Sequence, residues 1–440
     1  MSYTLRCSVV LGLLASQGCA APPSSSSSEA TASAASELTP QVAITPLSIS
    51  FAFAHPNLCD QLPGAPPGVG CLPAGIAGDD EVVLVGDPLV GQVLALQRLT
   101  GQQVGVLPQP NATGFILPFI LHSIGPGAVA ILDAGGFPNP PPPPGCTTCA
   151  PFEPAIPKIY EYHYALMGQS FQATLTRTVD FADSPNISTY GFAEDMLRLD
   201  DGEYLVSDAV FGSIWRVDVH GNVLPGIVPP TVSISNFNTY PPTGSIPQLV
   251  CCNFPEPLVD VGKVPFLFGG PSIPGIQAMA VRNGSVYYHS PSAFPIAGSG
   301  NGALFKFPLA ILTDDRTPQQ RAADIQLVAH APAGIQVEEL LELTFDPFDP
   351  FDEYLYAADA LQRRLIRIEP NTGVREVVAN DPALFNFPSS LAFAPPPAGA
   401  HAPLLVVSNQ QQNTPLTNLA ISSDQTQRPY TVTEVLLTNP

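Results

Sequence analysis

Two adjacent acidic residues, Glu194 and Asp195, stand at the entry to an apolar stretch and are the first candidates for chemistry in this sequence. A pair of carboxyl groups can exchange protons with a substrate or bind a hard cation such as calcium. The alternative is a solvated entry to a strand with no chemical role. The sequence leaves both open, so we carry Glu194 and Asp195 forward as candidate catalytic residues.

Two histidines are candidate bases. His122 and His289 each lie in an apolar stretch that we expect to form a strand, and either could face a central channel. A single histidine in a strand is otherwise a structural residue. The chain contains no Gly-x-Ser-x-Gly elbow, no phosphate-binding loop and no His-Glu-x-x-His motif. The hydrolases, nucleotide-binding proteins and zinc proteases defined by those motifs are therefore not indicated.

Six cysteines lie beyond the first nineteen residues, an even number that favours disulfide bonds in an oxidising compartment. They are Cys59, Cys71, Cys146, Cys149, Cys251 and Cys252. We favour a Cys59–Cys71 bond, which would close a loop rich in proline and glycine. Cys146 and Cys149 could instead form a redox or zinc pair, but zinc needs four ligands and no further cluster lies nearby. Cys251 and Cys252 could bridge each other or pair with that couple.

The N-terminus indicates export. Arg6 precedes an apolar run from Cys7 to Ala15, which is too short to cross a bilayer and is typical of a secretory signal. Cys19 after Gly18 resembles a bacterial lipoprotein box and is a candidate lipidation site, although Ser16 and Gln17 depart from that pattern. We therefore divide the chain into a signal peptide (1–19), a tether rich in serine and alanine (20–40) and a folded body (41–440). We expect a periplasmic or cell-surface protein.

The composition limits the partners. The chain of 440 residues has 37 acidic and 16 basic residues and a formal charge of −21. An acidic surface repels nucleic acid and anionic lipid, so we expect no nucleic-acid partner and no membrane contact except through a lipid at Cys19. A small molecule, a glycan or a protein remains as the ligand. The 52 prolines and 35 glycines favour short strands joined by loops over helices.

A strand pattern recurs along the body. In one clear copy, a strand from Asp195 meets a turn at Asp201-Gly202, and two further strands run to Asp208 and through residues 212–218. Six copies can be aligned, and their second strands end at Asp87, Asp133, Asp208, Ser290, Asp359 and Asn409. We expect these six residues to cap turns.

The six copies predict an all-β fold, a six-bladed β-propeller of four-stranded blades with long proline-rich loop insertions. A pair of β-sandwiches is the alternative, but it would predict two repeat groups separated by a linker. The alternating segment Leu47–Phe53 lies outside the six copies, and we expect it to add a strand to the last blade and close the ring.

The segments 201–218 and 354–369 resemble blades of NHL-type and regucalcin/gluconolactonase-like propellers, and the likeness extends over most of residues 75–437. In the lactonase-like members a calcium ion on the axis is held by Glu, Asn and Asp side chains and polarises a lactone or ester carbonyl. The matching positions here are Ala74, Pro118, Glu194, Gln277, Leu341 and Ser389. The resemblance therefore implies Glu194 as the strong calcium ligand, with neutral oxygens from Gln277 and Ser389. A register shift of one or two residues would bring in Asp195, Glu339 or Glu342.

Two functions follow as expectations. The first is an exported binding or scaffold propeller, with Cys19 as its candidate lipid anchor, that holds a small molecule, glycan or protein on its loop-rich face. The second is a calcium-dependent hydrolase of lactones or esters. Most of the expected axial ligands are missing at the matched positions, which favours the binding propeller.

Overall fold

The protein is described here by a computed structural model. The described residues are 50–52, 73–135, 156–183, 193–227, 269–274, 276–290, 302–348, 353–395, 404–409 and 431–436, with shorter gaps at 89–90, 99, 209–211, 271–272, 336–337, 382–383 and 386. The signal peptide, the tether, Cys19 and all six disulfide candidates lie outside them, as do the proline-rich insertions. No helix within these ranges has the length and apolar character needed to span a membrane.

Within the described residues, all strands except a two-stranded pair form six four-stranded antiparallel sheets that follow one another along the chain. The first sheet contains β2 (Ile76–Gly78), β3 (Val82–Asp87), β4 (Gln92–Gln97) and β5 (Gln103–Val106). The second contains β6 (Pro118–Gly125), β7 (Ala128–Asp133), β8 (Lys158–Met167) and β9 (Ser170–Asp180). The third contains β10 (Ala193–Arg198), β11 (Tyr204–Asp208), β12 (Ile214–Val217) and β13 (Val223–Ile227).

The second half of the chain repeats the arrangement. The fourth sheet contains β16 (Ala278–Arg282), β17 (Ser285–Ser290), β18 (Ala303–Pro308) and β19 (Gln326–His330). The fifth contains β20 (Leu340–Phe345), β21 (Leu355–Asp359), β22 (Arg364–Ile368) and β23 (Arg375–Ala379). The sixth contains β24 (Pro388–Ala394), β25 (Leu404–Asn409), β26 (Thr431–Leu436) and, from the other end of the chain, β1 (Ser50–Ala52).

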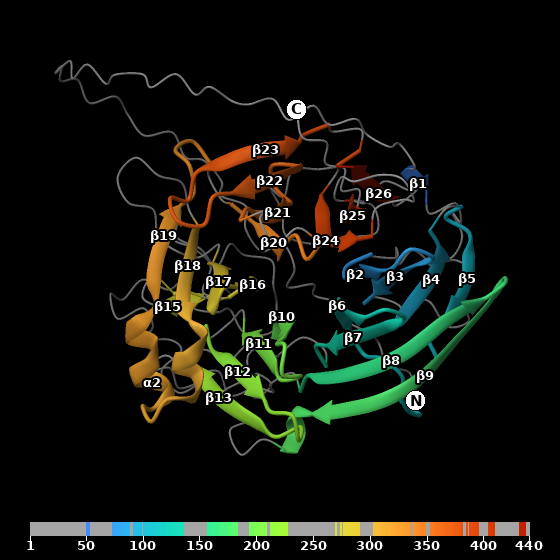
Figure 1. Cartoon of the computed structure of the whole chain (residues 1–440), viewed down its shortest axis with the longest axis horizontal. Coiled ribbons are helices and arrows are strands. Elements are labelled where there is room, and N and C mark those ends of the chain that lie inside the picture. Colours follow the sequence, from blue (N-terminus) through green and yellow to red (C-terminus); the bar gives the residue numbers. More distant parts are fainter. Residues whose placement is uncertain are drawn as a thin grey trace, which may run out of the picture.

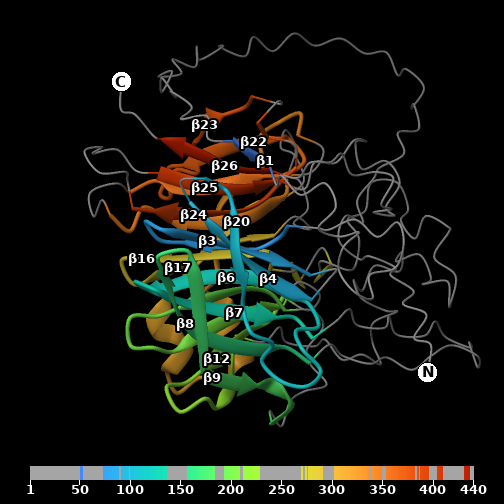
Figure 2. The same cartoon turned by 90° about the vertical axis from the view of Figure 1, so that its right-hand side faces the viewer.

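The sheets are the blades of a propeller. The first strands of successive blades, β2, β6, β10, β16, β20 and β24, are neighbours around the centre, and β24 lies against β2. Figure 1 looks down on this ring, with the blades radiating outward, and Figure 2 shows the blades stacked in side view. The predicted six-bladed fold is therefore confirmed, and the pair of sandwiches is excluded.

The ring is closed by strands from both ends of the chain. β1 pairs antiparallel with β26, with Ser50 opposite Thr433 and Ala52 opposite Thr431. The predicted closing segment thus forms the fourth strand of the sixth blade. It covers the β26 edge, which would otherwise offer unpaired backbone groups.

Among the described residues, the six larger hydrophobic clusters each lie between two neighbouring blades. Trp215 and Tyr204 of the third blade, for example, pack with Ile159 and Phe181 of the second. Every other pair of neighbouring blades, including the sixth and the first, also has buried apolar side chains packed between its two sheets. A single blade cannot bury its own two faces, so the closed ring is the unit of stability.

The second strands end where the repeat predicts. Their last residues, Asp87, Asp133, Asp208, Ser290, Asp359 and Asn409, are all buried. Asp133 illustrates the capping role, because its carboxylate accepts hydrogen bonds from the backbone N–H groups of Ile116, Leu117 and Gly135 at 2.7–3.0 Å. At this position the structural assignment is confirmed.

Smaller elements lie around the ring. η1 (Phe181–Asp183) follows β9, and η4 (Leu309–Thr313), α2 (Pro318–Arg321) and η5 (Ala322–Asp324) lie between β18 and β19. This helical insert was not predicted from the repeat. It is fixed to the third blade by Arg321, which donates to the Gly226 carbonyl at 3.1 Å and to the Asp314 carboxylate at 3.1 Å. β14 (Gly269–Gly270) and β15 (Ile273–Pro274) form a separate two-stranded sheet.

One face of the ring carries the starts of the inner strands. In blade pairs such as Ala193 with Asp208 and Pro118 with Asp133, the start of the first strand lies opposite the end of the second. Four long connections of the sequence follow strands that end at this face, namely 134–157, 228–268, 291–302 and 410–430. The connection 309–325, which carries the helical insert, follows a strand that ends at the other face. We call it the loop-bearing face.

Candidate functional site

A cluster of polar side chains lines the centre of the ring, where the inner strands begin. Its members, Glu194, Asp195, Gln277, Glu339 and Glu342, come from three consecutive blades and are each at most 4% exposed. Charged groups are rarely buried this fully unless they are paired or bound to a metal. The propeller axis is therefore the place to look for function.

Irregular starts of the inner strands expose successive residues to the axis. In β10 the register shifts between Ala193 and Met196, so that Glu194 and Asp195 share the space opposite Ser207. A bulge of this kind re-aims a side chain that would otherwise point away. A similar shift separates Leu340 from Glu342 in β20.

The bulge in β20 changes the predicted ligand register. Leu341, the position matched to the resembled family, packs in a small apolar cluster with Ala360 and Phe387. Glu339 and Glu342, on either side of it, belong to the axial group instead. The residues named by a register shift of one or two positions therefore lie on the axis, and their role as metal ligands stays a prediction.

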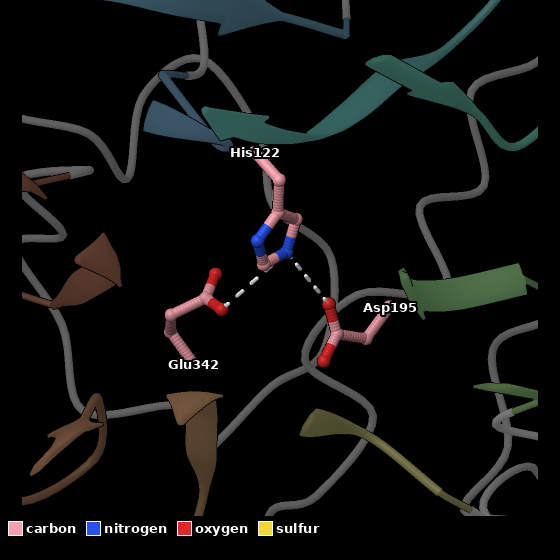
Figure 3. Close-up of side chains that lie close together, drawn as sticks. All are labelled: His122, Asp195 and Glu342. Atoms are coloured by element: carbon pink, nitrogen blue, oxygen red, sulfur yellow. Dashed lines mark hydrogen bonds and ion pairs between the residues drawn. The ribbon is translucent and has the colours of Figure 1, made fainter. Parts of the chain in front are cut away.

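Three side chains form a candidate metal centre. His122 from β6, Asp195 from β10 and Glu342 from β20 each offer a ligand atom, and these atoms all lie within 4.8 Å of one another. The His122 Nε2 atom is 3.4 Å from Asp195 Oδ1 and 3.9 Å from Glu342 Oε1. Figure 3 shows the two carboxylates converging on the imidazole from different blades. Water reaches this group through His122, which is 23% exposed, whereas Asp195 and Glu342 are buried.

Neighbouring blades fix both carboxylates. Asp195 Oδ2 accepts the backbone N–H of Met279 in the fourth blade. Glu342 Oε2 accepts the hydroxyl of Ser390 in the sixth blade at 3.0 Å. Ser390 Oγ in turn accepts the N–H of Ile76 in the first blade at 3.3 Å. The second blade adds His122, so the four blades that do not carry the two acids all help to hold them in place, the first of them through Ser390.

One oxygen of the site is left without a hydrogen bond. Glu342 Oε1, the atom facing His122, is buried and has no hydrogen-bond partner among the described residues. Leaving a buried carboxylate oxygen unsatisfied is costly. This oxygen is available to a ligand.

The pKa values reflect an excess of buried acid. Burial, with the charge of Asp195, raises the pKa of Glu342 well above its ordinary value. Burial also raises the pKa of Asp195, against hydrogen bonding to His122. The pKa of Glu194 is raised well above its ordinary value by burial and then by the charges of Glu339 and Asp195. Burial raises the pKa of Glu339 to about 7.

Among the described residues, arginine and lysine do not balance these acids. Within the described part of the chain, none of the four carboxylates forms an ion pair with either residue type, and His122 is the one basic side chain in contact with them. A cation from outside would relieve the repulsion and the desolvation together.

The donor set indicates which cations fit. One imidazole nitrogen and two carboxylates suit zinc and similar transition metals, and a water-accessible side leaves room for a further ligand. Calcium prefers six to eight oxygen ligands. The predicted calcium ligands Glu194 and Gln277 are placed on the axis, beside Glu339 and next to the three-residue group, so their role stays a prediction.

The other candidate base lies elsewhere. His289, at the end of β17, is fully buried, and its Nε2 atom is 3.6 Å from Glu338 Oε2. Arg375 also donates to Glu338, at 2.7 and 2.8 Å. Glu338 precedes β20, so this group connects the fourth and fifth blades. The structural interpretation of His289 is the one favoured, whereas His122 belongs to the axial site.

Two contributors were not anticipated from the sequence. Ser390 and the backbone N–H of Met279 position the acids, but neither stands in a recognisable motif. The predicted position in β24 was the preceding residue, Ser389, whose hydroxyl donates to the Pro73 carbonyl at 2.9 Å. A single-residue bulge between Pro388 and Ser390 separates the two roles.

No family model matches the sequence, and no curated protein matches it. Solved structures align over 84% of the chain. They include a luciferin-regenerating enzyme (12% identity, 92% of that chain, TM-score 0.44) and the calcium-binding protein regucalcin from Agrobacterium tumefaciens (14%, 93%, 0.40). A putative glucose dehydrogenase from Thermus thermophilus (15%, 98%, 0.41) also aligns. At this level of similarity, function has to be argued from the site itself.

Proposed function

We propose that this protein is an exported β-propeller that binds a divalent metal ion on its axis and, through that ion, a small oxygen-bearing ligand. The observation that carries the proposal is the convergence of His122, Asp195 and Glu342 within 4.8 Å. Three protein ligands with one water-accessible side are the arrangement that leaves a metal free to bind a further molecule. The ligand would approach from the loop-bearing face or along the axis.

The test is a metal titration. Protein stripped with EDTA would be titrated with Zn²⁺, Mn²⁺ and Ca²⁺ by calorimetry, together with His122→Ala, Glu342→Gln and the control His163→Ala. His163 is an exposed histidine in β8. We expect one of these ions to bind the wild type and the control equally, and each site variant to bind it at least about tenfold more weakly. Absence of binding to the wild type, or equal binding by all four proteins, would overturn the proposal.

A hydrolase of lactones or esters is the second candidate. The observation that favours it is Glu339, whose pKa is raised by burial to about 7 in the same axial cluster. A carboxyl group that titrates near neutrality can act as a general base, and an adjacent metal would polarise the carbonyl of the substrate. Metal-dependent turnover of a lactone and ester panel that is lost in Glu339→Gln would establish this activity. If the panel compounds bind without being hydrolysed, the result would favour the binding propeller over the hydrolase.

The proposed location rests on the first forty residues. The short apolar run and the tether support export to the periplasm or cell surface, and Cys19 is the candidate lipid anchor. We expect Cys19→Ser to release the protein from the membrane fraction into the soluble exported fraction. Recovery of the wild type in the soluble fraction would contradict the anchor but not export.

A further inference from the structure

A second polar group lies on the axis, closer to the loop-bearing face than the candidate metal centre. It consists of Glu194, Gln277 and Glu339. Gln277 and Glu339 lie just before the first residues of β16 and β20, and Glu339 precedes Glu342 by three residues, so the group extends toward the starts of the strands. Glu194 shares its position opposite Ser207 with Asp195 and lies between the two groups. The Gln277 Nε2 atom donates to Glu339 Oε1 at 3.4 Å, and Glu339 lies near enough to Glu194 for its charge, after burial, to raise the pKa of Glu194.

The group is short of positive charge. Glu194, Gln277 and Glu339 are 2%, 1% and 4% exposed, and neither glutamate has an arginine or lysine partner among the residues that the structure describes. Glu338, the residue before Glu339, differs in this respect because it forms an ion pair with Arg375. Two buried carboxyl groups without a cation are unfavourable unless a ligand supplies one.

An unsatisfied polar atom of Gln277 is a second observation, separate from the charges, that points to a ligand. Its Oε1 atom is buried and has no hydrogen-bond partner within the described ranges, although its Nε2 atom is turned toward Glu339. A buried amide oxygen normally accepts a hydrogen bond. The side chain therefore presents an unused acceptor beside the carboxyl group of Glu339.

The three acceptors match one donor chemistry. A primary ammonium group carries one positive charge and three N–H donors, which correspond to Glu194, Glu339 and Gln277 Oε1. A transition metal would lack a nitrogen or sulfur ligand here, and calcium would need several more oxygens. We infer that Glu194, Gln277 and Glu339 form a subsite for a primary ammonium group of the ligand.

The two axial groups together define a ligand class. This step rests on the proposed function, since it takes the metal at His122, Asp195 and Glu342 as the second contact. A molecule with an ammonium group at one end and a metal-coordinating oxygen a short distance away would satisfy both. Amino-substituted carboxylates, and esters or lactones that carry an amine, belong to this class.

The ammonium subsite can be tested without metal. In EDTA, wild-type protein would be titrated with propylammonium and with tetramethylammonium, which has the same charge but no N–H donor. We expect propylammonium to bind, tetramethylammonium to bind at least about tenfold more weakly, and Glu339→Gln to abolish that preference. The control variant Glu353→Gln changes an exposed glutamate and should keep the preference for propylammonium over tetramethylammonium. Equal binding of the two cations by the wild type would overturn the inference.

Two further measurements separate this subsite from the metal centre. If His122→Ala loses metal binding but keeps the propylammonium preference, the subsite holds on its own. If His122→Ala still binds a metal ion and Glu339→Gln removes that binding, the group holds a metal instead, and the inference fails. With metal present, β-alanine should bind the wild type about tenfold more tightly than propionate, which lacks the ammonium group. Thermal melts of each variant exclude unfolding as the cause.

Discussion

Glu338 and Glu339 are adjacent in the chain and lie in opposite electrostatic environments. Glu338 contacts Arg375 at 2.7 Å, whereas the carboxyl group of Glu339 accepts a hydrogen bond from the neutral amide of Gln277, at 3.4 Å. Burial tends to raise the pKa of both carboxyl groups. At Glu338 it is outweighed by His289 and Arg375, which lower the pKa to about 2, and at Glu339 it raises the pKa to about 7. One inner strand thus begins with a structural acid and an axial acid side by side.

This contrast predicts a pH-dependent stability. The pKa of Glu339 is raised above its ordinary value of 4.5, so its contribution is present below about pH 4.5 and is lost as the pH rises through about 7. We expect the metal-free protein to lose stability between pH 5 and pH 8, and Glu339→Gln to recover roughly 3 kcal/mol of that loss at pH 8. Thermal or urea unfolding of the wild type and Glu339→Gln in EDTA, at pH 5 and at pH 8, measures this difference in the free energy of unfolding.

The control for this prediction is the neighbouring residue. The pKa of Glu338 is lowered, so its contribution is present above about pH 4.5 and is lost only as the pH falls through about 2. Glu338→Gln should therefore destabilise the protein at both pH 5 and pH 8. A variant of Glu339 that is destabilised in the same way would contradict the assignment of Glu339 as an unpaired acid.

Ser390 is predicted to act on metal affinity without being a ligand. Its hydroxyl donates a hydrogen bond to Glu342 Oε2, and this holds the other oxygen, Oε1, toward His122. Residues that orient metal ligands typically change affinity by 10–100-fold when removed. Ser390→Ala should weaken metal binding by about tenfold, measured by the same calorimetric titration.

The adjacent serine supplies the matched comparison. The Ser389 hydroxyl donates to the Pro73 carbonyl and contacts the Ser408 hydroxyl, whereas the hydroxyl that reaches Glu342 is that of Ser390. Ser389→Ala should leave the metal affinity within about twofold of the wild type while lowering the melting temperature by an amount similar to Ser390→Ala. Equal loss of affinity in both variants would mean that the effect is general destabilisation.

The sequence was sufficient for the fold and only partly sufficient for the site. Strand alternation and turn residues placed six blades, and the last residue of each second strand was placed correctly from Asp87 to Asn409. The closing strand Ser50–Ala52 lies within the predicted segment Leu47–Phe53. These features depend on local patterns, which a single sequence displays.

The axial register could not be predicted in the same way. Single-residue bulges at the starts of β10 and β20 turn Asp195 and Glu342 toward the axis and leave Leu341 in an apolar cluster. A bulge leaves no reliable mark in the sequence, and here it decides which of several nearby acids meets His122. The contact of His122 with acids 73 and more residues away depends on ring closure, which is a property of the whole fold.

A buried ion pair between the first and last blades should be critical for stability. The Arg98 Nε atom is 2.8 Å from Glu434 Oε1, and Arg98 also donates to the carbonyls of Pro395 and Asp79. Removing one partner leaves the other charge buried and unpaired. Arg98→Met should reduce the free energy of unfolding by about 3–5 kcal/mol.

Two variants show whether pairing is the cause. Arg98→Met combined with Glu434→Met should recover part of the loss, because no charge is then left buried. Arg177→Met removes the more exposed pair with Glu161 and should change stability by about 1 kcal/mol or less. If the double variant is no more stable than Arg98→Met, the stabilisation comes from the carbonyl contacts instead.

The closing strand gives the last prediction. β1 covers the edge of β26, so its removal should expose that edge and weaken the contact between the sixth and first blades. A chain that begins at residue 50 retains β1, whereas a chain that begins at residue 54 lacks it. We expect the first to melt like the mature protein and the second to melt at least about 3 °C lower and to aggregate more readily, measured by calorimetry and light scattering. Equal melting of the two chains would show that the ring is closed without β1, and an equally lowered midpoint for both would show that residues before 50 contribute to the fold.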